Sequence, residues 1–533
     1  MAFYTNPNNP HPIDDAVSVS NNRYFQVNQI ADSRGIIIDP YGSSSAATSS
    51  TAFGEGLVAE LTPVFQLDGI YGFDSNKFEQ YNAFGGTVSL SKEMTVSTSA
   101  SAYSSAVLRS KRAVRYRPGQ GAMCRFTAAF TSGVNGYTQR AGFFAKEQAL
   151  QIGFNGTQFG ILRQNEGKAH IHEFEITSGA AGTETTTITL DGASYTANVT
   201  AGTPEENAVE IASSTFAGWL VEQEGAVVRF LSESIGVKAG VFSISSATLT
   251  DTETTLQVGA PNVETWVYQN DFNIDKLNGT GPSGVNLDLT KLNVWQINFR
   301  WLGAGEMRFA VEDPDNGDMI FFHHIHYSNR ETTVHLDNPS LKVGYVVADL
   351  NGSGGSEVSV SGASMLGAIE GKIVPTTYPV AARGYRSGGM NGNGNGMNTT
   401  NTIYHLLTVK NPIVYNNKIN TRELLVQKVS ALATIASSAP GTMFVYINPV
   451  INDDLLFQGF SQAKAALYST SNVSIDGSLN TPVAAFSVTS AAPQTIDLSD
   501  LRLTITPSSC ISVGFISGDN INAAEANLMF IED

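Results

Sequence analysis

The segment from Trp295 to Trp301 alternates apolar and polar residues without a break. Successive side chains of an extended strand point to opposite faces, so this alternation predicts a strand with one face buried and the other in water. The same alternation recurs at 307–311, and the Asp- and Asn-rich stretch 313–318 predicts a tight turn before a further strand at 319–327. Consecutive strands joined by tight turns are typical of antiparallel sheets packed as a sandwich.

The composition favours the same class of fold. Gly accounts for 50 of the 533 residues and charged residues for 15%, against a usual charged fraction of about 25%. Gly, Ser, Thr and Asn suit turns and short strands and weaken long helices. The chain is too long for one ordinary core, which predicts about two to four domains. We therefore expect a mainly β chain with a multi-domain antiparallel β-sandwich or jelly-roll architecture and a small inserted α+β module.

Shifts in composition divide the chain into parts. Prolines near the N-terminus and a Ser/Ala/Thr tract at 42–51 predict an arm, which either adds strands to a neighbouring subunit or forms a partly disordered tail. A Gly/Asn run at 388–398 is typical of a flexible linker. The expected organisation is an arm at 1–55, a sandwich built from 56–177 and 263–387, an inserted ββαββ module at 178–262, a linker at 388–400 and a C-terminal sandwich at 401–533.

Turn and cap signals predict the structure of the inserted module. Asp191-Gly192 separates two strand-like stretches and indicates a hairpin. Thr203 precedes Pro204 and is followed three residues later by Glu206, which is the pattern of a helix that starts with a capping box. We expect the helix to bury Val209, Ala212 and Phe216 and to end at Gly218.

Histidine pairs are the first candidates for metal binding. His170 and His172, and likewise His324 and His326, stand two residues apart, so each pair presents both imidazoles on one strand face. Such pairs can ligate zinc or nickel, or meet at the axis of a trimer, and they also occur as ordinary structural residues. The two cysteines are far apart in sequence, which predicts neither a disulfide framework nor a metal cluster.

The acidic loop at 312–318 could hold calcium. Its order differs from that of an EF-hand, and a hairpin turn rich in Asp and Asn needs no ion. The same carboxylates could serve a glycosidase or lyase. No GxSxG, Walker or dinucleotide motif is present, so we expect no enzymatic activity, no catalytic residues and no cofactor. The weak candidates for a metal site are Asp313, Asp315, Asp318, His324 and His326.

Arg109, Lys111, Arg115 and Arg117 belong to the densest basic run of the chain. In a strand their spacing would place them on one face. That face is a candidate interface for an acidic neighbouring subunit, an anionic glycan or a lipid headgroup, because charge complementarity fixes register. A solvated strand face explains the run equally well, and both interpretations stay open.

Net charge and hydropathy exclude other kinds of partner. A formal net charge of −17 argues against nucleic-acid binding, which normally needs a basic excess. The first residues lack the basic and apolar stretches of a signal peptide. No run of about 18 apolar residues occurs, so we expect no membrane insertion.

Residues 115–161 carry a pattern found in a known group of proteins. The pattern consists of Arg115-Tyr-Arg-Pro-Gly-Gln-Gly121, Arg125-Phe-Thr-Ala-Ala-Phe-Thr-Ser-Gly133, Thr138-Gln139 and Gly153-Phe-Asn-Gly-Thr-Gln-Phe-Gly-Ile161. It resembles virion structural proteins (minor capsid, fibre or tail-associated) of large algal DNA viruses and tailed phages, and a looser similarity covers most of 55–460. The resemblance implies β-sandwich modules, a location in the virion and other virion proteins as partners, and it supplies no catalytic residues.

Three functions therefore compete. The leading hypothesis is a virion structural protein that builds or decorates the particle surface as a homo-oligomer, with a trimer favoured. The second is a host-attachment protein that binds surface glycans, because aromatic side chains stack on sugars. The third is a polysaccharide-degrading enzyme on a sandwich scaffold. The aromatic candidates are Trp266, Trp295, Trp301 and Tyr385, of which Trp295 and Trp301 are better explained as core residues.

Assembly is the first testable expectation, and it rests on the low charge and the N-terminal arm. Light scattering of the purified chain at high concentration should give the mass of several chains. A strict monomer, with or without residues 1–55, would contradict it.

Overall fold

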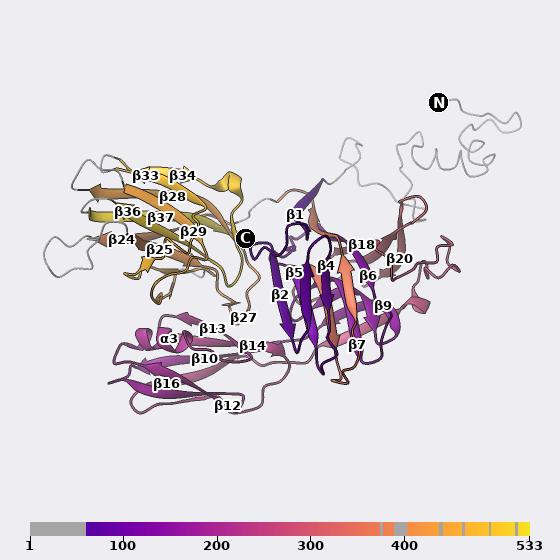
Figure 1. Ribbon diagram of the computed structural model, residues 1–533, viewed down its shortest axis with the longest axis horizontal. Coiled ribbons are helices and arrows are strands. Elements are labelled where there is room, and N and C mark those ends of the chain that lie inside the picture. Colours follow the sequence, from indigo (N-terminus) through magenta and orange to yellow (C-terminus); the bar gives the residue numbers. More distant parts are fainter. Residues whose placement is uncertain are drawn as a thin grey trace, which may run out of the picture. The chain divides into compact units, whose positions relative to one another are not determined.

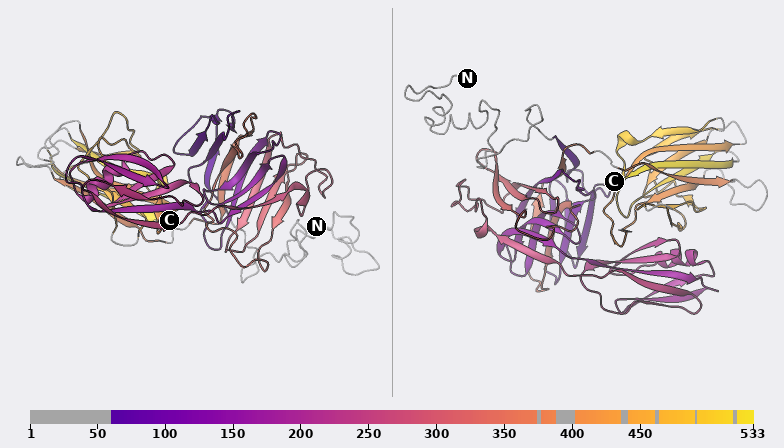
Figure 2. Two further views of the ribbon diagram at one scale, coloured as in Figure 1. Left: turned by 90° about the horizontal axis from the view of Figure 1, so that it is seen from below. Right: turned by 180° about the vertical axis from the view of Figure 1, so that it is seen from behind.

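The structure is a computed structural model that describes residues 60–373, 377–387, 402–435, 441–460, 464–489, 492–517 and 521–533. The expected arm at 1–55 and linker at 388–400 lie outside the described residues. Antiparallel strands make up almost all of the regular structure, which confirms the mainly β class and its sandwiches (Figures 1 and 2). The three largest hydrophobic cores of the described residues lie one in each of the sandwich, module and C-terminal regions.

Two antiparallel sheets form the first sandwich. The larger sheet contains, in spatial order, β20 (Met319–Ile325), β19 (Met307–Glu312), β18 (Asn293–Arg300), β6 (Gly121–Phe130), β22 (Ser359–Gly362), β4 (Met94–Ser97) and β3 (Thr87–Leu90), with β23 (Ser364–Glu370) joining β6 to β1 (Leu61–Asp68). The seven-stranded sheet contains β17 (Val263–Tyr268), β9 (Gln158–Asn165), β8 (Ala149–Asn155), β7 (Tyr137–Phe144), β21 (Lys342–Asp349), β5 (Ser105–Ser110) and β2 (Phe78–Ala83).

The predicted alternation in β18 and β19 faces the space between these sheets. Trp295, Ile297 and Phe299 of β18 are at most 1% exposed, as are the corresponding residues of β19. Phe299 meets Phe143 of the opposite sheet edge to face, with ring centroids 5.3 Å apart. The Tyr345 hydroxyl of β21 donates to the Thr127 carbonyl oxygen of β6 at 2.8 Å, so a buried polar bridge also joins the two sheets.

The inserted module contains the expected ββαββ order and three further strands. One sheet is formed by β13 (Trp219–Glu224), β14 (Val227–Ile235), β10 (Ala169–Ser178) and β16 (Thr250–Gln257), the other by β12 (Ala193–Val199), β11 (Glu184–Leu190) and β15 (Ser243–Ser245), and helix α3 spans Pro204–Ala212. The module interrupts the connection between β9 and β17, which are paired neighbours. A bridge between Lys168 and Ala260 closes its base.

The hairpin turn of the module and the start of its helix were predicted correctly, whereas the end of the helix was predicted wrongly. Asp191 and Gly192 form the hairpin turn with positive φ angles of 54° and 81°, and the capping box of Thr203 and Glu206 is present. The helix ends at Ala212, not at Gly218, which instead forms the turn before β13. Within α3 the buried residues are Asn207, Ala208 and Ile211, whereas the expected Val209 and Ala212 are only partly buried. Phe216 is buried as expected, although it lies beyond the end of the helix.

Asn207 explains the different helix face. Its side-chain oxygen accepts a hydrogen bond from the Ala180 amide at 2.7 Å, and its side-chain nitrogen donates to the Thr200 carbonyl oxygen at 2.8 Å. These bonds satisfy a fully buried amide and fix the helix with its polar residue inward. An apolar pattern alone does not contain that information.

Two boundaries differ from the expected ones. Strand β10 overlaps the range assigned to the first sandwich, yet it pairs with β14 and β16 because its Phe174 and Ile176 side chains enter the core of the module. Strand β24 (Val380–Ser387) was assigned to the same sandwich, and it pairs with β37 (Ile521–Glu532) at the end of the chain.

The C-terminal region is a second sandwich around Leu407, Val429, Val513 and Phe515. Its first sheet contains β24, β37, β28 (Leu424–Ile435) and β34 (Gln494–Asp497), with β35 (Thr504–Ile505) beside β28. Its second sheet contains β30 (Gln458–Gly459), β31 (Leu467–Ser469), β25 (Ile403–Lys410), β36 (Cys510–Ser517), β29 (Gly441–Ile447) and β33 (Ala484–Val488), with β32 (Ser474–Ile475) beside β25. A short hairpin, β26 (Val414–Tyr415) and β27 (Lys418–Ile419), follows β25.

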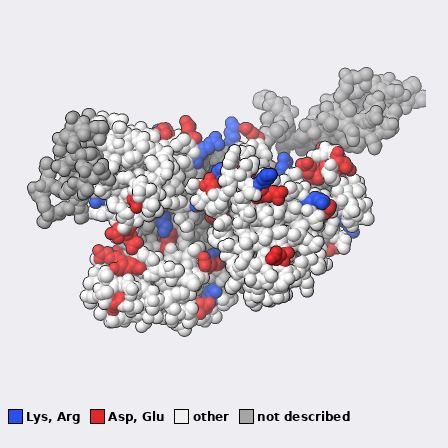
Figure 3. All heavy atoms as spheres, viewed as in Figure 1, with Lys and Arg blue, Asp and Glu red and all other residues white. Residues whose placement is uncertain are grey.

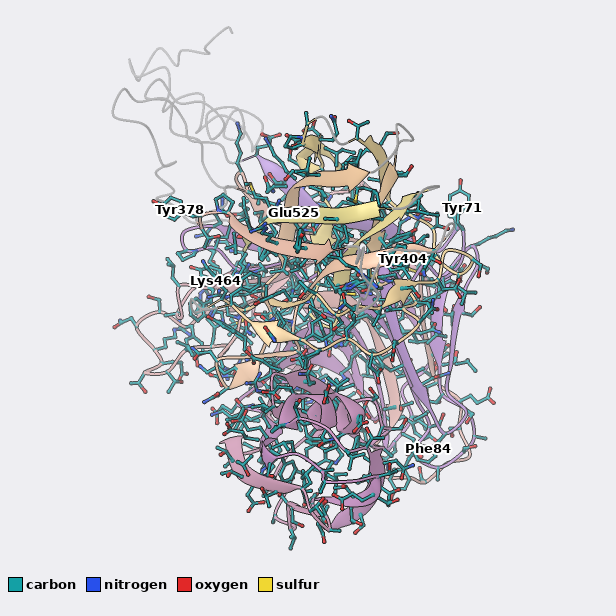
Figure 4. All side chains as sticks on the ribbon, turned by 90° about the vertical axis from the view of Figure 1, so that its left-hand side faces the viewer. Tyr71, Phe84, Tyr378, Tyr404, Lys464 and Glu525 are labelled. Atoms are coloured by element: carbon teal, nitrogen blue, oxygen red, sulfur yellow. The ribbon has the colours of Figure 1, made fainter. Side chains whose placement is uncertain are left out.

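Charged residues are sparse on the molecular surface, as the composition requires. In the view of Figure 3 most of the surface is uncharged, with small separate groups of acidic and basic side chains. Tyr71 and Phe84 project from the first sandwich and are 96% and 66% exposed (Figure 4). Within the described residues, no helix combines the length and the apolar character that a membrane crossing requires.

Replacing Thr203 with Ala should destabilise helix α3, because the side chain that caps the Glu206 amide is lost. The expected cost is about 1 kcal/mol, which corresponds to about fivefold faster hydrogen exchange of the helix amides. Hydrogen–deuterium exchange read out by mass spectrometry of fragments measures the exchange rate of the α3 amides separately from that of the other domains. Thr196→Ala, at an exposed position of β12, is the matched control and should leave exchange of α3 unchanged.

Candidate functional site

The outer face of the seven-stranded sheet collects polar and aromatic side chains. In β7, Tyr137, Ala141 and Phe143 point into the core, so strand alternation places Arg140 on the opposite face. The same rule places Gln151 of β8 outward, because Leu150 and Ile152 are in the core. Antiparallel pairing continues this outer face across β9 to the edge strand β17.

One row of paired residues across this face carries side chains only at its ends. Tyr268 of β17 lies opposite Gly160 of β9, which is followed by Gly153 of β8 and then Arg140 of β7. With about 4.8 Å between neighbouring strands, the row is about 14 Å wide from Tyr268 to Arg140. At Gly153 the backbone has φ +150° and a Cβ would lie 1.9 Å from the Gln139 carbonyl oxygen, so the position requires glycine. The two glycines leave an open floor between the two side chains.

Arg140 reaches over this floor toward the edge strand. Its Nη1 lies 3.8 Å from Glu264 Oε1, although β8 and β9 separate the two strands. The Arg140 side chain is 15% exposed, and its Nε is buried without a hydrogen-bond partner. Burial lowers the pKa of the Arg140 guanidinium, and the Glu264 carboxylate opposes that shift. The Arg140 guanidinium is therefore held by one long ion pair, and its Nε remains able to donate a hydrogen bond to a ligand.

The edge strand contributes two aromatic rings in parallel planes. Trp266 and Tyr268 have ring centroids 6.1 Å apart and an interplanar angle of 8°. The Trp266 Nε1 donates to Glu264 Oε2 at 3.2 Å, and Asn155 Nδ2 donates to the Tyr268 hydroxyl oxygen at 3.1 Å. Both rings are partly exposed, and the Glu264 side chain is 43% exposed, so this edge is open to solvent.

Gln151 supplies a second buried donor on the same face. The residue is 1% exposed, and its side-chain nitrogen has no hydrogen-bond partner. A buried amide nitrogen without a partner costs about 1–3 kcal/mol, and such groups are rare in native proteins. We name Arg140, Gln151, Asn155, Glu264, Trp266 and Tyr268 the aromatic–arginine patch. It combines ring surfaces for stacking, two donors that lack partners, one cation and one carboxylate.

The structure separates the aromatic candidates found in the sequence. Trp266 lies in the patch. Trp295 is fully buried, with its Nε1 donating to the Ala128 carbonyl oxygen at 3.3 Å, and Trp301 packs against the same core, so both are core residues as predicted. Tyr385 is 55% exposed on β24.

The basic run does not form one strand face. Strand β5 ends at Ser110, whose hydroxyl donates to the Arg112 carbonyl oxygen at 2.7 Å in a turn, so the period-2 geometry stops there. Arg109 pairs with Glu79 at 2.9 Å, and Lys111 donates to the Ser75 carbonyl oxygen at 3.2 Å. The guanidinium groups of Arg115 and Arg117 both pair with the Asp533 carboxylate.

The acidic loop satisfies its own polar groups. Asp313 Oδ1 accepts from the Asp315 amide at 2.9 Å, Asp313 Oδ2 accepts from the Asn316 side chain at 3.0 Å, and the Asp318 amide donates to Asn316 Oδ1 at 2.7 Å. This is the ordinary chemistry of an Asx-rich turn. The loop therefore needs no ion to hold its shape.

The two histidine pairs have different surroundings. His170 and His172 stack on Phe242 in the core of the module, and burial lowers the pKa of His172 to about 4. His324 and His326 instead meet a carboxylate, that of Glu306, with ion-pair distances of 3.1 and 3.2 Å. Among the residues that the structure describes, Glu306, His324 and His326 are the one group whose three potential ligand atoms all lie within 4.8 Å of one another.

Sequence reasoning missed Arg140, Gln151, Glu264 and Glu306. Arg140, Gln151 and Glu306 each adjoin an apolar residue that points into the core, and Glu264 lies two residues before Trp266, so alternation indicates which face each occupies. Their proximity depends on strand pairing, which the sequence of one strand does not specify. The available signal was a glycine in each of the neighbouring strands β7, β8 and β9.

Comparisons with known proteins identify no family. No family model and no curated protein matches the sequence. Among solved structures, the cellulose induced protein Cip1 matches at 12% identity with a TM-score of 0.24, covering 58% of this chain and 98% of that chain. Arcelin-5, a lectin-like defense protein from Phaseolus vulgaris, and a lectin from Bauhinia forficata in complex with GalNAc each match at 9% identity with the same coverage and TM-scores of 0.21 and 0.20. All three superpose loosely, so function has to be argued from the residues of this chain.

The Lys342 amine beside Glu79 should make stability depend on alkaline pH. Burial lowers the Lys342 pKa to about 8 from an ordinary 10.5, although Glu79, at 2.6 Å, opposes the shift. Between those values the unfolded chain binds the proton more tightly than the folded chain, so stability should rise with pH through this window. Chemical denaturation from pH 7 to 10.5 should show the wild type gaining stability relative to Lys342→Met. A constant difference across that range would contradict the assignment.

Proposed function

We propose that this chain binds carbohydrate at the aromatic–arginine patch, and that the preferred glycan carries an acidic group. One observation carries the proposal: the parallel Trp266 and Tyr268 rings lie on the same sheet face as buried donors of Arg140 and Gln151 that have no partners. Aromatic faces bind the apolar faces of sugar rings, whereas amide and guanidinium groups bind hydroxyls. The β-sandwich architecture is given by the fold and does not depend on this proposal.

The acidic preference follows from the state of Arg140. Its guanidinium contacts one carboxylate at 3.8 Å and is otherwise shielded from water. A carboxylate or sulfate on a sugar would form shorter, bidentate hydrogen bonds with this planar group. Such a ligand would also satisfy the Nε that has no partner. A neutral sugar offers only hydroxyls, so it should bind more weakly.

A glycan array, followed by calorimetry with the strongest ligand, tests the proposal. Trp266→Ala should weaken binding at least about tenfold, equivalent to about 1.4 kcal/mol, because the stacking surface is lost. Arg140→Gln should remove the preference for acidic over neutral glycans while leaving the ring platform in place. The two variants therefore separate the stacking contribution from the charge contribution.

Two matched controls keep these results specific. Tyr71→Ala removes an aromatic ring that is 96% exposed outside the patch. Arg125→Gln removes an arginine of β6, in the other sheet, which donates to Gln296 at 3.0 Å. Both controls should bind as the wild type does. Equal binding by all four variants, or no glycan bound by the wild type, would refute the proposal.

Degradation of the bound glycan is a separate outcome of the same experiment. Prolonged incubation of the wild type with its polysaccharide ligand, followed by a reducing-end assay, should give no release if the patch only binds. Release that is lost in Glu264→Gln would instead indicate a catalytic site. The expected place of the chain in a virus particle stays a prediction from resemblance, and detection of the chain in purified particles would test it.

A further inference from the structure

Glu306, His324 and His326 form a cluster at the edge of the larger sheet of the first sandwich. Strand β20 is the outermost strand, and its pairing with β19 places Arg308 opposite His324 and Met307 opposite Ile325. Continuing that register by one residue brings Glu306 opposite His326. Because side chains alternate, Glu306, Arg308, His324 and His326 share one face.

The positions of the ligand atoms match those around a small metal ion. Glu306 Oε1 lies 3.1 Å from His324 Nδ1 and 3.2 Å from His326 Nδ1, and one ligand atom from each residue lies within 4.8 Å of the others. Around a tetrahedral ion with bonds of about 2.0–2.1 Å, neighbouring ligand atoms are about 3.3 Å apart. Small side-chain rotations would therefore place all three atoms at bonding distance from one ion.

Surrounding groups hold the cluster in position. Arg308 Nε donates to Glu306 Oε2 at 2.6 Å, which orients the carboxylate with Oε1 toward the histidines. Asn273 binds the backbone of His324 on both sides, accepting from its amide at 2.9 Å and donating to its carbonyl oxygen at 2.8 Å. Such supporting contacts are typical of metal ligands, because they fix ligand orientation before the ion binds.

We propose that Glu306, His324 and His326 bind a divalent transition-metal ion, with zinc as the preferred ion. Two imidazole nitrogens and one carboxylate oxygen suit zinc and its neighbours, whereas calcium and magnesium require a shell of oxygen ligands. The His326 side chain is 45% exposed, so a fourth position faces solvent and can take water. The site does not depend on the proposed glycan binding.

The ion would connect the end of β20 to the start of β19. His326 follows the last residue of β20, and Glu306 precedes the first residue of β19. A metal bond between these positions would hold the outermost strand at its end, where strands otherwise fray. Binding to the folded chain alone would raise the unfolding temperature in proportion to the logarithm of metal concentration.

Cobalt(II) and zinc titrations of the metal-free chain test the proposal. The wild type should bind one cobalt ion per chain with the intense visible absorption of a four-coordinate site, and zinc should displace it. His326→Ala, at the most exposed ligand, should lower affinity at least tenfold, and Glu306→Gln should do the same. Far-UV circular dichroism establishes that each variant remains folded.

The acidic loop provides the matched control. Asp313→Asn and Asp315→Asn remove carboxylates from an exposed turn without touching the cluster, and they should bind cobalt as the wild type does. Loss of binding in these variants would move the site to the loop and overturn the assignment. Wild-type binding no tighter than that of folded His326→Ala, or a weak six-coordinate spectrum, would also overturn it.

Discussion

The packing of two sheets against each other determines what the rest of the first sandwich can do. Phe143 and Phe299 meet edge to face between the sheets, and the buried hydroxyl of Tyr345 joins them by a hydrogen bond. A shift of one residue in β7 or β18 would turn these rings to the outside, so the core fixes the orientation of every strand. The positions of Arg140 and Gln151 on the outer face are consequences of that constraint.

The core determines which side of each strand faces inward. The outer face of the seven-stranded sheet can therefore hold groups that lower the stability of the fold. A largely buried guanidinium and an amide nitrogen without a partner both carry a desolvation cost. Glycines at 153 and 160 keep the floor clear for the arginine side chain. Polar groups retained at such a cost, together on one face, are the observation from which the proposed binding surface is inferred.

Local patterns predicted the fold well because they act over a few residues. Alternation identified β18, and the Asp191-Gly192 turn and the Thr203 cap had the expected geometry. Pairing between distant strands is not encoded locally, so the approach of Arg140 to Glu264 could not be predicted. For the same reason the approach of Glu306 to His324 and His326 could not be predicted. On α3 the buried amide of Asn207 outweighed the apolar pattern, which a binary reading of the sequence cannot anticipate.

The inserted module has a consequence for the order of folding. Strands β9 and β17 pair as a hairpin would, yet about 90 residues separate the two ends of their connection at Lys168 and Ala260. Closing so long a loop in an unfolded chain is entropically unfavourable, and slow compared with a tight turn. A folded module brings its own ends together, so β17 should dock after the module has folded. We therefore expect the edge strand that carries Trp266 and Tyr268 to be completed late, at a rate set by the folding of the inserted module.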